Sequence, residues 1–253
     1  MTAWPSALLW DVDGTLAETE LEGHRLAYNQ AFAQLNLPWH WDVPLYQQLL
    51  SISGGRERLR DFLGRVEAVP PSPDLLTALQ EAKQQHYSAL VAGGALQLRP
   101  GVRRLMEDAA AAGLRQGIVT TSARAAVQAL LQQALPEHER LLQFWVCADA
   151  VERKKPDPQA YQLALDQLAL PAEQVLAIED SGNGVASATA AGVAVLVTRS
   201  ASSSTEPAAA FALALAELNH LGDPGDPCRV ERGLACPEGL ITLSYLQQLL
   251  STR

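Results

Sequence analysis

Apolar runs of strand length alternate with stretches of helical spacing over most of the chain. Residues 7–12 (ALLWDV) form a short apolar run that ends in acids, which predicts a buried strand. Four later runs have the same character, namely RQGIVT, FWVCA, VLAIED and VAVLVT. Helical spacing precedes or separates these runs at 101–113, 123–134, 158–169 and 183–191. The alternation predicts an α/β fold in which a parallel sheet has helices on both faces.

The segment between the first and second strands differs because it has no strand-like run. Residues 18–37 have apolar positions nearer to helical than to strand spacing, and Pro38 stops that helix. We expect further helices at 43–51, 56–67 and 73–92. The sequence thus predicts a Rossmann-like parallel-sheet core with an all-helical cap domain inserted after the first strand. The predicted domains are a core of residues 1–16 and 98–253 and a cap of residues 17–97.

The chain after residue 200 has a weaker pattern. Residues 200–210 predict a loop that leads into a short helix. The sequence FALALAEL (211–218) is compatible with a helix or a strand, and its pattern does not decide between them. Residues 222–237 are rich in Gly, Pro and Asp and predict irregular structure of no assigned role. An amphipathic helix is expected over 239–251.

Composition and charge narrow the classes of function. The chain has 253 residues, of which 48% are hydrophobic and 19% charged. None of its apolar runs approaches the roughly 20 residues of a membrane span. Its net charge of −9 argues against nonspecific nucleic-acid binding. We therefore expect neither a membrane nor a nucleic acid as a partner.

The three cysteines indicate a reducing compartment. Cys147 lies in an apolar segment, where a small core residue is expected. Cys228 and Cys236 are eight residues apart and have no neighbouring histidine or CxxC pattern. That spacing disfavours a disulfide or a metal site between them. The protein is expected to be cytoplasmic.

Two carboxylates follow the first predicted strand directly. Asp11 and Asp13 are separated by one residue and followed by Gly14, which permits a tight turn. In an open parallel sheet, ligands bind in the crevice beyond the carboxyl ends of the strands. Two acids there repel each other unless a cation or a proton lies between them, and Mg²⁺ prefers such oxygen ligands. The alternative is a solvated acidic turn.

Three more polar groups follow later strands in the same way. Thr120–Ser122 place three hydroxyls before a helix, where they can bind phosphate or act only as N-caps. Arg153, Lys154 and Lys155 precede Pro156 and offer cations for a phosphate, or form a solvated loop. Glu179 and Asp180 end another buried strand, with helix capping as the alternative. The four groups together, each at a strand end, are more specific than any one alone.

In these motifs the sequence resembles the haloacid dehalogenase superfamily of phosphohydrolases. The resemblance implies that Asp11 is the nucleophile and Asp13 the general acid and then base. It also implies that Thr120 holds the phosphoryl group and Lys155 offsets its charge. The implied ligands of Mg²⁺ are Asp11, the Asp13 backbone carbonyl, Glu179 and Asp180. For the acid role we expect a neighbouring carboxylate and partial burial to raise the pKa of Asp13.

The predicted cap carries two further groups of polar residues. Glu20 and His24 lie in its first helix, and Gly54-Gly55-Arg56-Glu57-Arg58 is a glycine turn that opens a helix with two cations. Such a turn suits a second anionic group, although it is also compatible with a solvated helix entry. The chain resembles the CbbY-type phosphatases in these cap residues and in three stretches, namely DVDGTLAETE, WHWDVPLYQQLLSISGGRERL and HLGDPGDPCRV. Where that family has a lysine after the two glycines, this chain has Arg56, which binds phosphate by a planar fork.

This second resemblance implies hydrolysis of xylulose 1,5-bisphosphate, a misfire product that inhibits Rubisco, to xylulose 5-phosphate. The implied substrate-binding residues are Asp13, Glu20, His24, Gly54, Gly55, Arg56, Glu57, Arg58, Thr120, Thr121, Ser122, Arg153 and Lys155. A mutase of the β-phosphoglucomutase type and a phosphatase for another small sugar phosphate remain open. A silent binding protein is disfavoured because all four motifs are complete. We expect a monomer.

Overall fold

The fold is organised around one seven-stranded sheet. The computed structural model describes residues 5–67 and 71–252. Over these residues the strands lie in the order β3-β2-β1-β4-β5-β6-β7, and all neighbours are parallel except β6 and β7. The strand bounds are β1 Ala7–Trp10, β2 Arg115–Val119, β3 Phe144–Val146, β4 Val175–Glu179, β5 Ala194–Thr198, β6 Ala216–Leu218 and β7 Val230–Arg232. The predicted parallel sheet is confirmed.

Strand β1 is central because both of its edges are paired. Leu9 lies opposite Gly117 of β2 on one side and opposite Ala177 of β4 on the other. All residues of β1 are buried, as is typical of a parallel strand whose two faces are both covered. The indole of Trp10 donates to Oε1 of Gln116 at 3.0 Å, so both buried polar groups have a partner.

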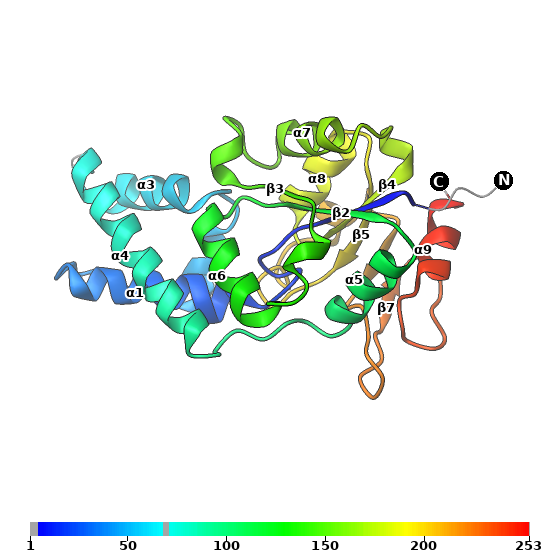
Figure 1. Cartoon of the computed structure of the whole chain (residues 1–253). Helices are drawn as coiled ribbons and strands as arrows, with labels where there is room; N and C mark the ends of the chain where they lie inside the picture. The colour runs from blue at the N-terminus through cyan, green and yellow to red at the C-terminus, as the bar shows by residue number, and fades with distance from the viewer. Residues whose placement is uncertain (1–4, 68–70, 253) are drawn as a thin grey trace.

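Helices cover both faces of the sheet. Leu8 and Trp10 belong to the apolar cluster that α5, α6 and α9 close, whereas Leu9 belongs to the cluster that α7 and α8 close. Figure 1 shows α7 and α8 above the sheet and α5 and α6 below it. The helix bounds are α5 Val102–Ala111, α6 Arg124–Ala134, α7 Gln159–Leu168, α8 Gly182–Ala190 and α9 Leu243–Leu250, with short 3₁₀ turns at Glu139–Leu141, Ala148–Ala150 and Ala172–Gln174.

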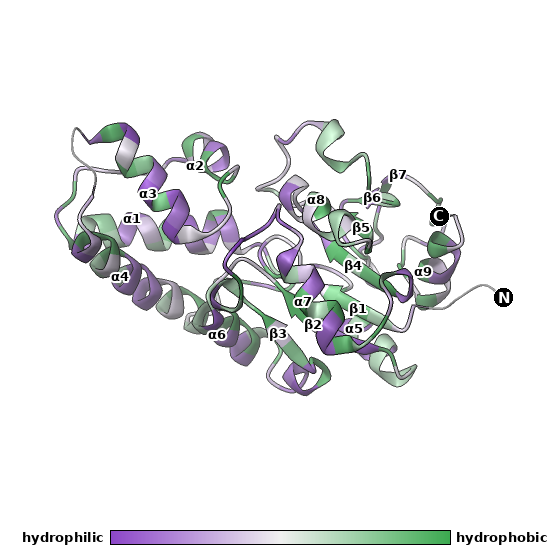
Figure 2. Ribbon diagram, turned by 90° about the horizontal axis from the view of Figure 1, so that it is seen from above, coloured by the Kyte–Doolittle hydropathy of each residue, from purple (hydrophilic) through white to green (hydrophobic). Residues whose placement is uncertain are grey.

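A helical module is inserted between β1 and β2. It comprises the π-helical turn η1 Glu20–His24 and the helices α1 Arg25–Gln34, α2 Val43–Leu49, α3 Gly55–Val66 and α4 Pro73–Ala92. Its own core is aromatic, and the rings of Trp41 and Phe62 meet edge to face with centroids 5.3 Å apart. The module lies to one side of the sheet (Figures 1 and 2) and reaches it through α4, which packs against α6. The inserted helical cap is confirmed, while the borders at 16/17 and 97/98 stay predictions.

Several expected elements have different bounds. The helix expected over 18–37 is divided into η1 and α1 and ends at Gln34, because Asn36 adopts a left-handed conformation with a φ of 54° before Pro38. The expected helix over 239–251 begins only at Leu243, where the side chain of Thr242 caps it. Over the described ranges 5–67 and 71–252, none of the helices has the length and apolar character needed to cross a bilayer.

The segments left open by the sequence are resolved as follows. FALALAEL contains the end of a 3₁₀ turn, Ala208–Phe211, and then strand β6. The expectation of irregular structure over 222–237 is wrong at one place, because β7 pairs there with β6. This is a short antiparallel edge strand, and Gly and Pro around it hide its pattern. Cys147 is buried as expected, and Cys228 and Cys236 are both free thiols.

Candidate active site

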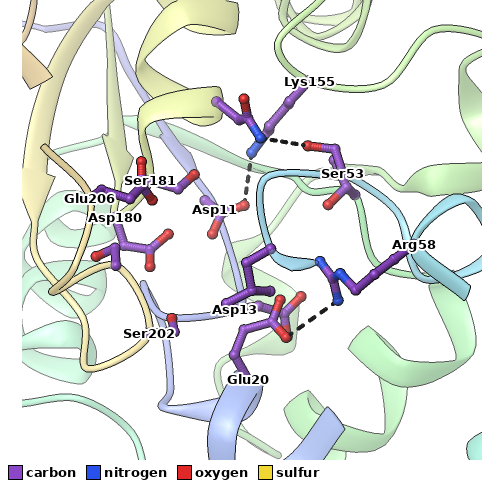
Figure 3. A pocket seen from close by; sticks show the side chains of 14 residues that line it. Asp11, Asp13, Glu20, Ser53, Arg58, Lys155, Asp180, Ser181, Ser202 and Glu206 are labelled. Atoms are coloured by element: carbon purple, nitrogen blue, oxygen red, sulfur yellow. Dashed lines mark hydrogen bonds and ion pairs between the residues drawn. The ribbon is translucent and has the colours of Figure 1, made fainter. Parts of the chain in front are cut away.

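Carboxylates from two neighbouring strands meet at the carboxyl edge of the sheet. Asp11 follows β1, and Glu179 and Asp180 lie at the end of β4, which pairs with β1. Carboxylate oxygens of these three buried residues lie within 4.8 Å of one another. In Figure 3 the side chains of Asp11 and Asp180 point toward each other across a small cavity. The parallel register thus brings together two motifs that are far apart in the sequence.

Lys155 is the cation of this cluster. Its Nζ donates to Oδ1 of Asp11 at 2.8 Å, to Oε1 of Glu179 at 2.6 Å and to the carbonyl of Val119 at 2.8 Å. Burial alone would lower the pKa of Lys155, but Asp11 and Glu179 raise it above its usual value. The lysine therefore stays charged and holds the first strand end against the loop before α7.

One cation does not balance this group of acids. Burial, with smaller contributions from Glu179 and Asp13, raises the pKa of Asp11 to about 8 against the opposing effect of Lys155. Burial and then Asp11 raise the pKa of Asp180 well above its usual value. Oε2 of Glu179 has no hydrogen-bond partner among the described residues. Buried carboxylate oxygens short of positive charge fit a hard divalent cation, so the donor set is compatible with a metal centre.

The loop after β1 depends on a glycine and a distant arginine. Gly14 has a φ of +86°, and a Cβ there would lie 2.1 Å from Oδ2 of Asp180. Its carbonyl accepts a hydrogen bond from Arg99, which also donates to the carbonyls of Thr198 at 2.8 Å and Arg199 at 2.6 Å. Arg99 thus anchors the loop to the end of β5. The sequence did not indicate this role, because most of its partners are backbone carbonyls of segments that are remote in the chain.

Asp13 lies on the side of the loop that faces the helical module. Its carboxylate accepts hydrogen bonds from the hydroxyls of Thr19 and Ser122, and Nε2 of His24 lies 2.9 Å from Oδ1. Burial would raise the pKa of Asp13, but His24 and the two hydroxyls lower it well below its usual range. The expected rise in this pKa is therefore wrong for the ligand-free arrangement. These hydrogen bonds stabilise the charged form more than the neighbouring carboxylate destabilises it.

A buried lysine completes this side of the site. Nζ of Lys83 lies 2.8 Å from Nδ1 of His24, whose ring stacks on Tyr87 with centroids 4.3 Å apart. The arrangement assigns Nδ1 as acceptor and Nε2 as the donor to Asp13. Burial lowers the pKa of Lys83 to about 8. Sequence reasoning missed this lysine because it lies in the middle of a helix and its partner is far away in the chain.

The two arginines of the glycine turn have different surroundings. Arg58 is buried and donates to the hydroxyl of Tyr46 at 3.1 Å and to the carbonyl of Leu49 at 3.3 Å, with Oε2 of Glu20 at 3.7 Å. Arg58 therefore does not belong to a solvated helix face, which was the alternative function-free interpretation of the glycine turn. Arg56 is exposed at the cavity wall.

The site consists of a small cavity that opens into a larger one. The small cavity, of about 60 Å³, is lined by residues that include Asp11, Asp13, Lys155 and Asp180. A second cavity, of about 420 Å³, extends into the helical module and shares Glu20, Arg58 and Thr121 with the first. The smaller space suits a phosphoryl group and the larger one a sugar phosphate.

Three of the candidate substrate-binding residues, namely Glu57, Thr120 and Arg153, line neither cavity. Thr121 lines both cavities, whereas Thr120 is buried behind it and accepts a hydrogen bond from the backbone N–H of Ser122 at 3.1 Å. Arg153 lies outside both cavities, pairs with Asp157 at 2.7 Å and is 61% exposed. The neighbouring Lys154 lines the larger cavity instead.

Comparison with known proteins fixes the class that this fold and site define. The family model of haloacid dehalogenase-like hydrolases matches residues 5–192. The chain belongs to this family, and the predicted enzyme class, a phosphatase of the superfamily, is confirmed.

More specific similarity is to CbbY proteins. The plasmid-borne protein CbbY of Cupriavidus necator is 43% identical over 226 residues, which cover 87% of each chain. Crystal structures of CbbY from Rhodobacter sphaeroides, one with phosphate and one of a variant with xylulose-(1,5)bisphosphate, are 38% identical. Each superposes with a TM-score of 0.79 over 85% of this chain and 94% of theirs. A putative β-phosphoglucomutase from Thermotoga maritima is 26% identical, with a TM-score of 0.56 over 75% of this chain and 83% of its own.

Proposed function

We propose that this chain is a magnesium-dependent sugar-bisphosphate phosphatase that hydrolyses xylulose 1,5-bisphosphate to xylulose 5-phosphate and phosphate. The observation that carries the proposal is the pairing of Asp11 with Lys155 in a small acidic cavity that opens into a cation-lined one. The 38% identity to CbbY, which is known in complex with xylulose-(1,5)bisphosphate, supports the choice of substrate. In the cell, a cytoplasmic enzyme of this kind would remove an inhibitor of Rubisco.

The proposed reaction proceeds by two displacements at phosphorus. An oxygen of Asp11 attacks the 1-phosphoryl group, the bond from phosphorus to the sugar oxygen breaks, and Asp13 gives its proton to that oxygen. Water then attacks the aspartyl-phosphate, Asp13 accepts the proton of this water, and free phosphate and Asp11 are regenerated. Lys155 offsets the charge on the transferred group. The resemblance assigns the hydrogen bond to its oxygens to Thr120, whereas the geometry favours Thr121, which lines the small cavity.

The metal in this proposal is Mg²⁺. Asp11, the backbone carbonyl of Asp13, Glu179 and Asp180 would hold it, and when bound it supplies positive charge that reduces repulsion between nucleophile and phosphate. The fully buried Glu179 already accepts hydrogen bonds from Lys155 and Tyr161. Both hydrogen bonds go to Oε1, so Glu179 positions that lysine and keeps Oε2 available for the metal.

Asp13 requires a proton for the first step, and the ligand-free site favours its charged form. The proposed source of the change is the substrate itself. A phosphate dianion beside Asp13 disfavours a second negative charge, and it competes for the hydroxyl of Ser122. Both effects raise the pKa of Asp13 when the substrate binds.

A mutase is the second candidate, because the Thermotoga maritima relative of that name shares the fold and 26% of the sequence. A mutase of this type would return the phosphoryl group from Asp11 to the other end of the sugar. Incubation with a hexose 1-phosphate, followed by analysis for the 6-phosphate, separates the two candidates. A phosphatase should release inorganic phosphate without forming the isomer.

The decisive experiment is phosphate release from a panel of sugar mono- and bisphosphates, measured as kcat/KM with Mg²⁺ and after treatment with EDTA. We expect xylulose 1,5-bisphosphate to be the best substrate and chelation to abolish its turnover. Calcium should inhibit, since its larger and looser coordination shell does not favour in-line geometry. Full activity in excess EDTA after dialysis would refute the metal dependence, and preference for a monophosphate would refute the substrate.

A further inference from the structure

Two larger cavities adjoin the catalytic cavity, and they differ in charge. The one of about 420 Å³ contains four lysine or arginine side chains in its wall. The other, of about 850 Å³, lies between α2 and α8 and has Glu206 but no lysine or arginine among the described residues that line it. Electrostatics therefore directs an anionic group at the far end of a substrate into the 420 Å³ cavity.

The four cations of this cavity come from different parts of the molecule. Arg56, Arg58 and Lys83 belong to the helical module, whereas Lys154 belongs to the core. Arg58 and Lys83 are buried and hydrogen-bonded within the module. Lys154 is different because it lies on a loop of the core, where it directly precedes the catalytic Lys155.

Lys154 crosses the boundary between the core and the module. Its Nζ lies 2.6 Å from Oε2 of Glu57, in the first turn of α3. The lysine side chain is 17% exposed and the glutamate 43%. A Cβ on Gly54 would lie 2.6 Å from Nζ and 2.7 Å from Cδ of Lys154. The bare backbone of the glycine turn thus makes room for this lysine at the cavity wall.

We propose that Lys154 is a specificity-determining residue that binds the distal phosphate of a bisphosphate substrate, and that Glu57 holds it in place until the phosphate displaces the carboxylate. This inference rests on the proposed function, and it adds a core residue to a subsite otherwise built by the cap. Lys154 and Lys155 then address the two phosphates of one substrate from a single loop.

The energetics favour such an exchange of partners. An ion pair with one partly exposed member contributes little to stability, so Glu57 is easily displaced. A phosphate carries more charge than a carboxylate and offers three acceptor oxygens to the ammonium group. A hydrogen bond from Lys154 lowers the pKa of Glu57 against the opposing effect of burial. The carboxylate is therefore ionised and able to hold the lysine in the ligand-free protein.

The test is Lys154→Met in the full chain, with kcat/KM measured for xylulose 1,5-bisphosphate and for p-nitrophenyl phosphate. The methionine keeps the length and apolar stem of the side chain and removes its charge. We expect a loss of about 10- to 100-fold for the bisphosphate, the size of one charge-assisted contact, mainly through KM. The loss for p-nitrophenyl phosphate should be at least about tenfold smaller, since that ester has no distal phosphate.

Two further variants separate ligand binding from a mere cap–core contact. Glu57→Gln removes the carboxylate that competes with the distal phosphate for Lys154, so KM for the bisphosphate should decrease. Arg65→Met, which removes an exposed cation at the far end of α3, is the matched control and should not change the ratio of the two substrates. If Glu57→Gln and Lys154→Met lower bisphosphate turnover equally, and the double variant is no worse, the pair is only a latch and the proposal is overturned. Equal losses by Lys154→Met on both substrates would overturn it as well.

Failure of the proposed function gives a different result. If the unmodified protein does not hydrolyse the bisphosphate, the substrate assignment fails whatever Lys154 does. Calorimetric binding of xylulose 1,5-bisphosphate to the Asp11→Asn protein, with and without Lys154→Met, then tests the subsite alone. Weaker binding by about tenfold or more supports Lys154 as the ligand, and equal binding excludes it.

Discussion

The carboxyl edge of the sheet and the cavity under the helical module are built in different ways. At the sheet edge, the backbone register of β1 and β4 places Asp11 beside Glu179 and Asp180, and Lys155 joins Asp11 to Glu179. In the module, Arg58 and Lys83 are placed by side-chain contacts between helices. The comparison teaches that strand ends position the side chains proposed to carry out the reaction, whereas packing between the helices of the cap positions the side chains proposed to select the substrate.

Among the variants that test this difference between the sheet edge and the module, Asp11→Asn is expected to have the largest effect on activity. The amide cannot attack phosphorus, so turnover of every substrate should fall by more than about 1,000-fold. The loss should be equal for p-nitrophenyl phosphate and the bisphosphate, because both need the same nucleophile. The fold should persist, since the change removes a buried acid whose pKa burial raises to about 8. Stopped-flow phosphate release and circular dichroism measure the two outcomes, and normal turnover would sink the mechanism.

Arg58→Ala should act on the module first. The change removes the hydrogen-bond donor to Tyr46 and the cation beside Glu20, so the partly buried carboxylate keeps the hydroxyl of Tyr46 as a partner but loses its positive charge. Breaking such a pair costs about 3 kcal/mol in the free energy of unfolding. Urea unfolding followed by tryptophan fluorescence, to which Trp39 and Trp41 of the module contribute, should report the loss. The double variant Glu20→Gln with Arg58→Ala should recover part of it, and no recovery would mean that packing alone is responsible.

The difference between the two regions also decides what the sequence could predict. Asp11 and Asp180 follow continuous apolar runs, so their strand ends, and with them the acidic centre, were evident from the local pattern. Lys83 was not, because a lysine within a helix gives no sign that it will be buried against His24. The pKa of Asp13 was predicted in the wrong direction for the same reason, since its lowering depends mainly on His24 and Ser122, which lie outside its own loop.

The pH dependence of activity tests the contribution of Lys83 to the cavity in the helical module. Burial lowers its pKa to about 8, so the side chain is charged below that pH and neutral above it. The groups that face it are His24, Tyr28, Tyr87, Glu20, Arg58 and Asp13. Loss of the proton removes a positive charge from the cavity, so kcat/KM for the bisphosphate should fall by up to about tenfold between pH 7 and 9. Lys83→Met should abolish this step in the profile, and p-nitrophenyl phosphate is the control substrate. An unchanged profile in the variant would assign the step to another group.

The smallest effect is expected from Arg153→Met. The sequence offered three adjacent cations and indicated Arg153 and Lys155 as substrate ligands, but side chains that follow one another on a loop point in different directions. Arg153 is exposed and paired with Asp157 four residues on, and an ion pair this exposed contributes little to stability. Its removal should therefore change kcat/KM for the bisphosphate by less than about twofold, whereas Lys154→Met should cost at least tenfold. A loss by Arg153→Met as large as that of Lys154→Met would mean that the loop turns when the substrate binds. Substrate binding would then depend on the combined charge of residues 153–155 and not on one side chain. The contrast between a preformed sheet edge and a cap arranged by packing would not apply to this loop.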